Sequence, residues 1–432
     1  MRQLYVSIEN DGRMREVGCI SGNSEYDATF SYSDDYLSSP AARPISISLP
    51  LRPEPYGPEA TGNFFEGLLP EGFLRRKIAE NNRTDSGGYF DLLTILGAEC
   101  LGAVQIVGDN YHELTPEYRP LDHDLMCRLA TEGATVSADL VVETHLSLTG
   151  ASGKVGVYRS ADGKWYLPVG TAPSTHILKQ SHIRYDHIVQ NEQLALKTAS
   201  VLGIETPESE IIQREGSGNN KRSVIRSKDG TVLLATRRFD RIIPENAPLI
   251  DGLPVPRRLH QEDFAQAMGI PSSNKYEHAG DEHMKRMFDM LRQYSASPIE
   301  DQMKLWDIIV FHYLIGNTDG HIKNFSLLYD SSLGSVRLAP AYDIVSTIVY
   351  DSHSEQMAFN IGGDTDWDQL GRDSFERAAE SIGLNNKIFM QRFDAMKERF
   401  IPALLQTAEQ MQADGFDEAL DIAHVIIEKH GW

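Results

Sequence analysis

The chain has few cysteines and no long apolar run, and each of these shortages excludes a class of protein. Its three cysteines, Cys19, Cys100 and Cys127, are scattered, odd in number and without the spacing of metal ligands. We interpret them as reduced thiols of a cytosolic protein. No apolar stretch is long enough for a membrane span, and the N-terminus lacks the charged start and apolar run of a signal peptide. The sequence therefore predicts a cytoplasmic protein with no membrane segment.

Positive charge is also scarce. The 432 residues include 41 Lys and Arg against 62 Asp and Glu, so the formal net charge is -21. Non-specific nucleic-acid binding relies on a basic footprint, and this balance argues against it, although a basic partner or a local basic patch stays open. Hydrophobic residues make up 41% of the chain and charged residues 24%, which is ordinary for a globular protein. Length alone suggests about two to four domains.

The amino-terminal region has the pattern of a small strand-rich domain. Short alternating runs predict strands, and helical patterns lie among them. The expected strands cover residues 4–8, 16–20, 29–32, 45–49 and 103–107, and the expected helices include Arg75 to Lys77 and residues 90–96. Residues 109–139 are polar and are expected to connect or cap. These patterns predict an N-terminal domain over residues 1–108 and a connector over 109–139.

The rest of the chain follows the order of a protein kinase. Strand patterns occur at residues 141–147, 165–169, 175–179, 210–212 and 231–239, with an amphipathic helix over 188–202. Helical patterns follow at 261–268, about 277–297, about 299–315 and after 366. The prediction is an α+β protein, in which the strand-rich N-terminal domain precedes a bilobal protein-kinase-like fold with a helical C-terminal lobe. We place the kinase N-lobe at 140–242 and the C-lobe at 243–432.

Residues 311–326 carry the strongest chemical signal. They place Asp319 and Asn324 in a short turn between an apolar helical run and an apolar strand. This is the offset of a kinase catalytic loop, where the Asp handles the hydroxyl proton and the Asn holds Mg²⁺. Asp343 follows soon after, and two acids with an amide suit Mg²⁺, which prefers a few hard oxygen ligands. The alternative is that Asp319-Gly320 is only a turn and Asn324 only a cap.

A glycine loop and a lysine precede that segment in kinase order. Gly150, Gly153 and Gly156 lie between two strand patterns, and glycines let the backbone approach phosphates. Their spacing matches neither a Walker motif nor G-x-G-x-x-G, and a flexible hairpin is the alternative. Lys179 ends a later strand, from which it would reach the α- and β-phosphates, and Glu192 on the next helix would pair with it. Solvated side chains are the alternative for both.

A hinge is expected at residues 236–241, which follow a strand and precede a Pro-rich loop. Backbone groups near Phe239 would bond the adenine, and Asp240 the ribose. The alternative is a strand end with salt-bridged arginines. The His-Arg-Asp and Asp-Phe-Gly triplets of typical kinases are absent, so we do not expect an ordinary eukaryote-like kinase. The candidate nucleotide-binding residues are Gly150, Ala151, Ser152, Gly153, Lys154, Lys179, Arg238, Phe239, Asp240, His321, Lys323, Asn324 and Asp343.

These motifs together resemble the HipA family, serine/threonine kinase toxins of bacterial type II toxin–antitoxin systems. The resemblance covers almost the whole chain. It rests on residues 42–51, 63–70, 90–93, 147–151, 191–192, 238–241, 260–264, 319–325 and 342–344. The chain departs from the family pattern at Arg237, where an acid or neutral residue is usual, and at Ser152-Gly153-Lys154, where Gln-Glu-Lys is frequent.

The resemblance implies phosphorylation of protein serine or threonine that depends on ATP and Mg²⁺. Asp319 would be the catalytic base, Asn324 and Asp343 the metal ligands, and Lys179 the phosphate-binding lysine. Some family members modify an aminoacyl-tRNA synthetase, which arrests translation and growth. A small HipB-like DNA-binding antitoxin neutralises the family's toxins, so this chain would meet DNA only through such a partner.

Two loop serines are candidate autophosphorylation sites. Ser147 corresponds to the serine that relatives autophosphorylate, and Ser152 is a rival acceptor inside the loop. A phosphate adds close to two negative charges, so it would repel ATP and limit the kinase's own activity. Two other functions stay open: a catalytically weak kinase-like binding module in a repressor complex, and a small-molecule kinase.

Overall fold

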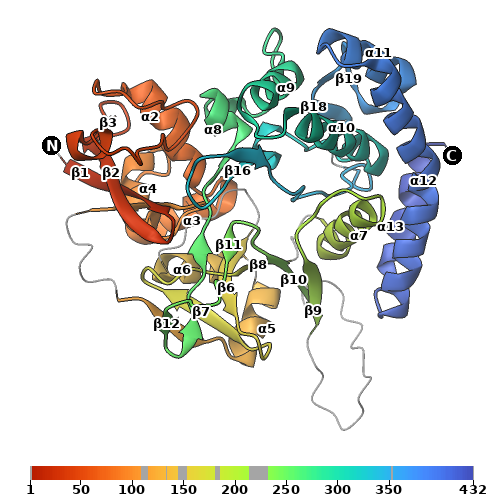
Figure 1. Ribbon diagram of the computed structural model, residues 1–432. Helices are drawn as coiled ribbons and strands as arrows, with labels where there is room; N and C mark the ends of the chain where they lie inside the picture. The colour runs from red at the N-terminus through yellow and green to blue at the C-terminus, as the bar shows by residue number, and fades with distance from the viewer. Residues whose placement is uncertain are drawn as a thin grey trace.

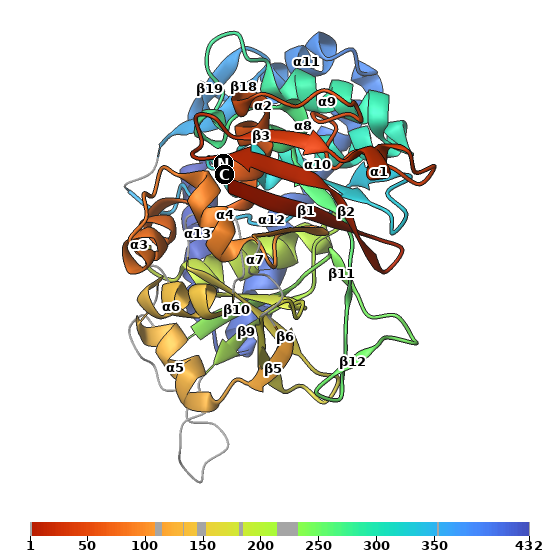
Figure 2. The same cartoon turned by 90° about the vertical axis from the view of Figure 1, so that its left-hand side faces the viewer.

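The computed structural model describes residues 2–108, 115–132, 134–144, 153–180, 185–213, 232–351 and 354–431. The chain forms a strand-rich N-terminal domain, a six-stranded sheet with helices, and a helical lobe (Figure 1). Figure 2 shows the N-terminal strands above the six-stranded sheet and in front of the helical lobe. This is the predicted α+β fold, with a small strand-rich domain before two kinase-like lobes.

The N-terminal domain is built on a four-stranded antiparallel sheet in the order β3-β2-β1-β4. Alternate side chains of β1, namely Leu4, Val6 and Ile8, are buried, as expected of a strand with one face on a core. The strands are β1 (Arg2–Asn10), β2 (Arg13–Gly22), β3 (Thr29–Tyr32) and β4 (Val104–Val107). The helices are α1 (Asp34–Leu37), α2 (Pro58–Phe65), η1 (Glu66–Leu68), α3 (Gly72–Asn82) and α4 (Tyr89–Leu96).

The strand predicted at residues 45–49 is wrong, because this segment forms turns and bends. Its polar groups bond to the C-terminal lobe instead of a neighbouring strand. The Ser46 hydroxyl donates to Glu262 Oε2 at 2.5 Å, and the Ile47 backbone N–H donates to Glu262 Oε1 at 3.1 Å. His260 Nε2 lies 2.8 Å from the Ile45 carbonyl oxygen. The segment therefore joins two regions that are far apart in the sequence.

The second region is an antiparallel sheet in the order β5-β7-β6-β8-β10-β9. Its outermost strand β5 lies in the stretch expected to connect or cap, where Tyr118 pairs with Pro168 of β7. The strands are β5 (Glu117–Pro120), β6 (Lys154–Arg159), β7 (Trp165–Val169), β8 (His176–Gln180), β9 (Ser209–Gln213) and β10 (Val232–Arg237). The helices are α5 (His123–Glu132), α6 (Ala134–Thr144) and α7 (Ile188–Val201).

The strand predicted at residues 141–147 is wrong over 141–144, because α6 continues to Thr144. Ala138 and Val141 are fully buried, and their spacing of three places both on one helix face. That amphipathic face outweighs the strand preference of the two adjacent valines at 141 and 142. Residues 145–147 lie outside the described residues.

The C-terminal lobe is mostly helical, as predicted, with short strands among the helices. The predicted helix over 261–268 begins later, because Gln261–Asp263 form β15 and Asp263 caps α8 by accepting from Gln266 N at 2.8 Å. The helices are α8 (Phe264–Met268), η3 (Ser272–Asn274), α9 (His283–Tyr294), α10 (Pro298–Ile315), η4 (Ile322–Asn324), η5 (Trp367–Gln369), α11 (Arg372–Ser381), α12 (Asn386–Ala413) and α13 (Glu418–Lys429). The strands are β11 (Arg241–Ile242), β12 (Leu249–Ile250), β13 (Leu253–Pro254), β14 (Arg257–Arg258), β15 (Gln261–Asp263), β16 (Ser326–Tyr329), β17 (Val336–Leu338), β18 (Gln356–Ile361) and β19 (Asp364–Asp366).

The buried apolar residues show how the regions are joined. One continuous cluster runs from the N-terminal strands through α2, α4 and α8 into the helical lobe as far as α13. A second cluster lies between the six-stranded sheet and α5 and α6. The N-terminal domain and the helical lobe therefore share a core, whereas the six-stranded sheet has its own. In the described part of the chain, no helix is both long and apolar enough to cross a membrane.

Candidate active site

The loop after α10 holds Asp319 and Asn324 in a fixed geometry. The helix ends at Gly316, whose φ of 72° is left-handed and whose added Cβ would lie 2.3 Å from a side-chain carbon of Ile348. The Asp319 backbone N–H then donates to Asn317 Oδ1 at 3.1 Å. Asn324 Oδ1 accepts from the His321 backbone N–H at 3.1 Å. Local hydrogen bonds therefore set the positions of both predicted site residues.

A cluster of positively and negatively charged side chains faces this loop. Lys179, near the end of β8, donates to Asp343 Oδ1 at 2.6 Å and also contacts the carboxylate of Glu192 on α7. Lys154, the first residue of β6, lies 3.4 Å from Asp343 Oδ2. Asn324 Nδ2 lies 3.4 Å from the same oxygen. The structure thus brings together five residues that the sequence placed in one site.

The charges fix the protonation of two members of this cluster, Asp343 and Lys179. Burial would raise the pKa of Asp343, but Lys154 and Lys179 outweigh it and hold that pKa well below its usual range. Burial would likewise lower the pKa of Lys179, whereas Asp343 and Glu192 raise it. Asp343 is therefore an ionised carboxylate, and Lys179 is a cation.

Two adjoining cavities meet at this cluster. The outer cavity, of about 240 Å³, is lined both by Asp319 and Asn324 of the loop after α10 and by the charged cluster. The inner cavity, of about 70 Å³, is largely apolar and reaches Thr236 and Phe239. Lys154, Lys179, Glu192, Tyr342 and Asp343 line both.

The donor groups fit ATP and Mg²⁺. An ionised carboxylate and an amide are hard oxygen ligands that leave further positions for phosphates and water, as Mg²⁺ requires. In the part of the chain that the structure describes, no cluster of three His, Cys, Asp or Glu side chains offers an all-protein metal site. In the inner cavity, the buried Thr236 hydroxyl makes no hydrogen bond to any described residue, so it is available to a polar ring edge.

The hinge residues form a buried ionic network. Asp240 accepts from Arg238 Nη2 at 2.7 Å, from Gln261 Nε2 at 2.9 Å and from the Gly102 backbone N–H at 2.8 Å. Its side chain is 2% exposed. Both carboxylate oxygens accept hydrogen bonds from Arg238, which favours the salt-bridge alternative for Arg238 and Asp240, although both residues also line the inner cavity. Phe239 does face the inner cavity, with its ring centroid 5.6 Å from that of Tyr342.

Lys323 lines the outer cavity but points its amino group at acids. Its Nζ lies 3.3 Å from Glu71, 3.5 Å from Asp263 and 3.1 Å from the Ser272 hydroxyl. The side chain is 4% exposed. The neighbouring His321 is also buried, which lowers its pKa to about 3 and keeps it neutral. In this arrangement the Lys323 amino group is engaged by Glu71, Asp263 and Ser272 and supports the loop.

The glycine loop is described only at its end. Gly153 and Lys154 are both buried, and Lys154 reaches Asp343 as given above. Gly150 and Ala151 lie outside the described residues, as do the two serines Ser147 and Ser152. Their predicted roles stay predictions.

Two residues near the site were missed in the sequence. Glu71, which precedes α3, accepts from Lys275 Nζ at 2.6 Å as well as contacting Lys323. Tyr276 donates a short hydrogen bond to the carboxylate of Asp319. One signal was available for Glu71, because the family-like segment 63–70 ends directly before it. Tyr276 lies in a loop with no motif of its own.

Comparison with known proteins finds similar chains. Residues 12–107 match the HipA N-terminal domain, and residues 146–404 match the HipA-like C-terminal domain. The protein Y4mE of Sinorhizobium fredii is 31% identical over 422 residues, which cover 96% of this chain and 93% of that protein. The serine/threonine-protein kinase toxin HipA of Shewanella oneidensis is 24% identical over 425 residues, 93% of this chain and 90% of that toxin.

A solved structure shares the fold. It is the toxin–antitoxin complex of HipA, HipB and operator DNA from Shewanella oneidensis MR-1. The two chains superimpose with a TM-score of 0.76 at 21% identity, over 98% of this chain and 96% of the other. With both domains matched along the chain, the protein belongs to the HipA family.

Proposed function

We propose that the chain is a cytoplasmic serine/threonine protein kinase that transfers the γ-phosphate of ATP with the help of Mg²⁺. The observation that carries the proposal is one cavity lined by Lys179, Asp319, Asn324 and Asp343 together. Phosphoryl transfer needs these four groups: a cation that binds phosphate oxygens, a group that positions the acceptor, and two metal ligands.

Each residue has a separate task in this proposal. Lys179 binds phosphate oxygens, and Glu192 holds its amino group toward the cavity. Asp343 and Asn324 hold Mg²⁺, which when bound neutralises charge on the phosphates. The carboxylate of Asp319 orients the acceptor hydroxyl and takes its proton. Phe239 and the Thr236 hydroxyl form the wall against the adenine.

The acceptor is a protein in this proposal, and its modification arrests translation and growth. Autophosphorylation at Ser147 or Ser152 then limits the activity. The name of the Shewanella relative supports a toxin role. The HipB chain in the related complex supports a DNA-binding antitoxin as partner. A net charge of -21 makes direct binding of this chain to DNA unfavourable, so the chain alone should not shift duplex DNA in a gel.

Transfer of labelled phosphate tests the proposal. The purified chain is incubated with γ-labelled ATP and a bacterial lysate, with Mg²⁺ or with a chelator. We expect acid-stable label on protein serine or threonine only when Mg²⁺ is present. Binding of ATP without transfer to any protein would favour the catalytically weak binding module, and transfer to small metabolites alone would favour a small-molecule kinase.

A further inference from the structure

The hydroxyl of Tyr276 lies against the carboxylate of Asp319. Its O–H group donates a short hydrogen bond to Oδ1 of Asp319, the carboxylate proposed to receive the acceptor's proton. The ring packs edge-on against His321, with the centroids 5.3 Å apart and the planes at 83°. A hydroxyl within hydrogen-bond reach of the general base has the geometry that proton transfer requires.

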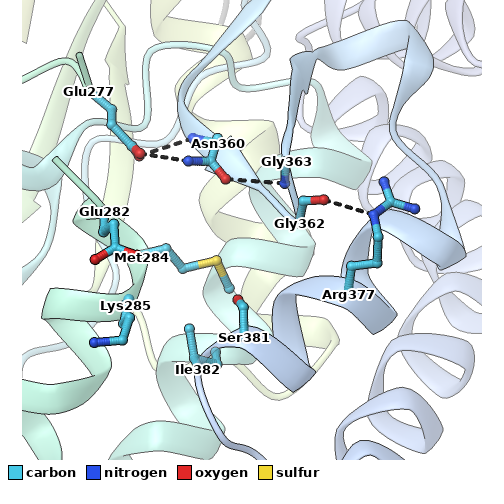
Figure 3. Close-up of a pocket in the computed structure, with 10 residues that line it drawn as sticks. All are labelled: Glu277, Glu282, Met284, Lys285, Asn360, Gly362, Gly363, Arg377, Ser381 and Ile382. Atoms are coloured by element: carbon cyan, nitrogen blue, oxygen red, sulfur yellow. Dashed lines mark hydrogen bonds between the residues drawn. The ribbon is translucent and has the colours of Figure 1, made fainter. Parts of the chain in front are cut away.

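The residues on either side hold Tyr276 in place. Lys275 is bound to Glu71 of the N-terminal domain at 2.6 Å. On the other side, the Glu277 backbone N–H donates to the Ala358 carbonyl at 2.8 Å. The Glu277 carboxylate accepts from Asn360 Nδ2 at 2.6 Å and from its backbone N–H at 3.0 Å (Figure 3). Anchors on two separate parts of the chain therefore direct the tyrosine to Asp319.

The Tyr276 phenol that contacts Asp319 is protonated. Burial, and then the charge of Asp319, raise the pKa of Tyr276 well above its usual value. At neutral pH the phenol is thus a neutral O–H donor, like the hydroxyl of a serine acceptor. The residue is 41% exposed, which leaves room for the ring to swing out after a reaction.

We propose that Tyr276 is a phosphoacceptor of its own chain, a site that accepts phosphate in addition to serine or threonine. This inference rests on the proposed kinase function. The phenolic oxygen forms a bond to the γ-phosphorus of ATP while the bond from that phosphorus to the β–γ bridging oxygen breaks. ADP leaves with that electron pair, and the phenol proton passes to Asp319 and then to water.

The product would not stay where the phenol lies. A phosphotyrosine carries close to two negative charges at neutral pH, and it would stand against the carboxylate of Asp319. Like charges at contact repel each other, so the modified side chain moves away from Asp319. Phosphorylation of Tyr276 therefore frees Asp319 for the hydroxyl of another protein.

Peptide mapping after incubation with Mg²⁺-ATP tests the inference on the full chain. Trypsin releases residues 276–285, in which Tyr276 is the one hydroxyl side chain, so a phosphate ester there has a single possible position. We expect it in the wild type and not in Asp319→Asn or Tyr276→Phe. Tyr294→Phe is the matched control, since Tyr294 is equally exposed at 42%, and it should keep the phosphate on Tyr276.

The rate and the distribution of label separate the outcomes. Transfer within one chain gives an initial rate per molecule that does not change when the protein is diluted tenfold. A rate that falls with dilution would overturn transfer within the chain. Label on serine or threonine with an unmodified Tyr276 peptide would overturn the inference and leave the proposed kinase standing. No transfer to any acceptor would overturn both.

Discussion

Two clusters of buried charge lie near the same hinge, and they differ in what they leave open. The interface cluster joins the N-terminal domain to the hinge and consists of Glu99, Arg238, Asp240, Arg241 and Arg258. The cavity cluster consists of Lys154, Lys179, Glu192 and Asp343. The Asp240 side chain is 2% exposed, whereas that of Asp343 is 30% exposed. Both aspartates lie in the wall of the inner cavity, but the carboxylate of Asp343 is much the more open to a ligand.

A lowered pKa does not distinguish the two clusters. Neighbouring cations outweigh burial at both Asp240 and Asp343 and hold both pKa values well below the usual range. Perturbed titration marks structural ion networks as well as functional sites. The difference lies in the number of donors and in exposure: four hydrogen bonds surround the carboxylate of Asp240, which is 2% exposed. The carboxylate of Asp343 is 30% exposed and lies beside Asn324 in the outer cavity. Exposure to a cavity, together with charge, is therefore the better guide to chemistry.

The largest expected effect is the loss of transfer in Asp319→Asn. The amide cannot take the acceptor's proton, and general-base terms contribute about 10²- to 10⁴-fold to rate. We expect a fall of that size in the transfer of labelled phosphate, with an unchanged thermal midpoint because Asp319 is exposed. Asp289→Asn, which removes an exposed pairing partner of Lys285, should keep full activity. Wild-type turnover in Asp319→Asn would reduce Asp319 to a turn residue.

Asp240→Asn should break the interface cluster. The substitution removes the negative charge of Asp240, whose Oδ2 lies 2.7 Å from Arg238 Nη2 and 2.9 Å from Arg241 Nη1. Breaking a buried ion pair costs about 3–5 kcal/mol. The free energy of unfolding in urea should fall by that amount, while residual ATP binding by folded protein stays near the wild-type value. A stable variant with weakened ATP affinity would instead restore Asp240 to the nucleotide site.

The burial of Glu262, which outweighs its hydrogen bonds from Ser46, Tyr329 and Ile47, should make stability depend on pH. Burial raises the pKa of Glu262 from 4.5 to about 7. Between these values the unfolded chain has lost the proton and the folded chain keeps it, so the free energy of unfolding falls as pH rises. The titration of Glu262 lowers the free energy of unfolding by about 3 kcal/mol across this range.

Glu262→Gln removes that titration while keeping a hydrogen-bonding side chain of the same size. Urea unfolding at pH 5 and at pH 7.5 should therefore show a smaller decrease for this variant than for the wild type. Glu245→Gln lies at an exposed loop position. Its free energy of unfolding should decrease between the two pH values as much as that of the wild type does. Equal decreases in all three proteins would show that Glu262 does not titrate in this range.

The lobes, and the loop that holds Asp319 and Asn324 together, were predictable because their signals are local. Helical periodicity marks α10, and the spacing from Asp319 to Asn324 lies within one loop. The partners of that loop were not predictable, because they come from distant segments. Glu71 contacts Lys323 across more than two hundred positions. Ser46 and Ile47 likewise bond to the distant Glu262. No local pattern encodes such docking, and so a turn was predicted as a strand.

The hinge shows the limit of a motif. The segment from Arg238 to Arg241 has the charged and aromatic residues expected beside a nucleotide, and its order in the chain is right. Whether an aspartate there binds ribose or arginine depends on Glu99 and Gly102, which the N-terminal domain supplies. The roles of the hinge side chains are therefore set by tertiary contacts.

The smallest effect in this comparison is expected from Asp343→Asn, which changes the cavity cluster as Asp240→Asn changes the interface cluster. Asp343 has a left-handed φ of 58°, which asparagine tolerates, so the backbone is kept and only charge is lost. A neutral amide binds Mg²⁺ less well than a carboxylate does. Lys154 and Lys179 also lose the carboxylate that competes with phosphates for them. Calorimetric titration should show the gain in ATP affinity from Mg²⁺ reduced about tenfold, or about 1.4 kcal/mol, with metal-free ATP bound at least as tightly as in the wild type. An undiminished gain from Mg²⁺ would remove Asp343 from the metal ligands and leave it as the counter-ion of two lysines.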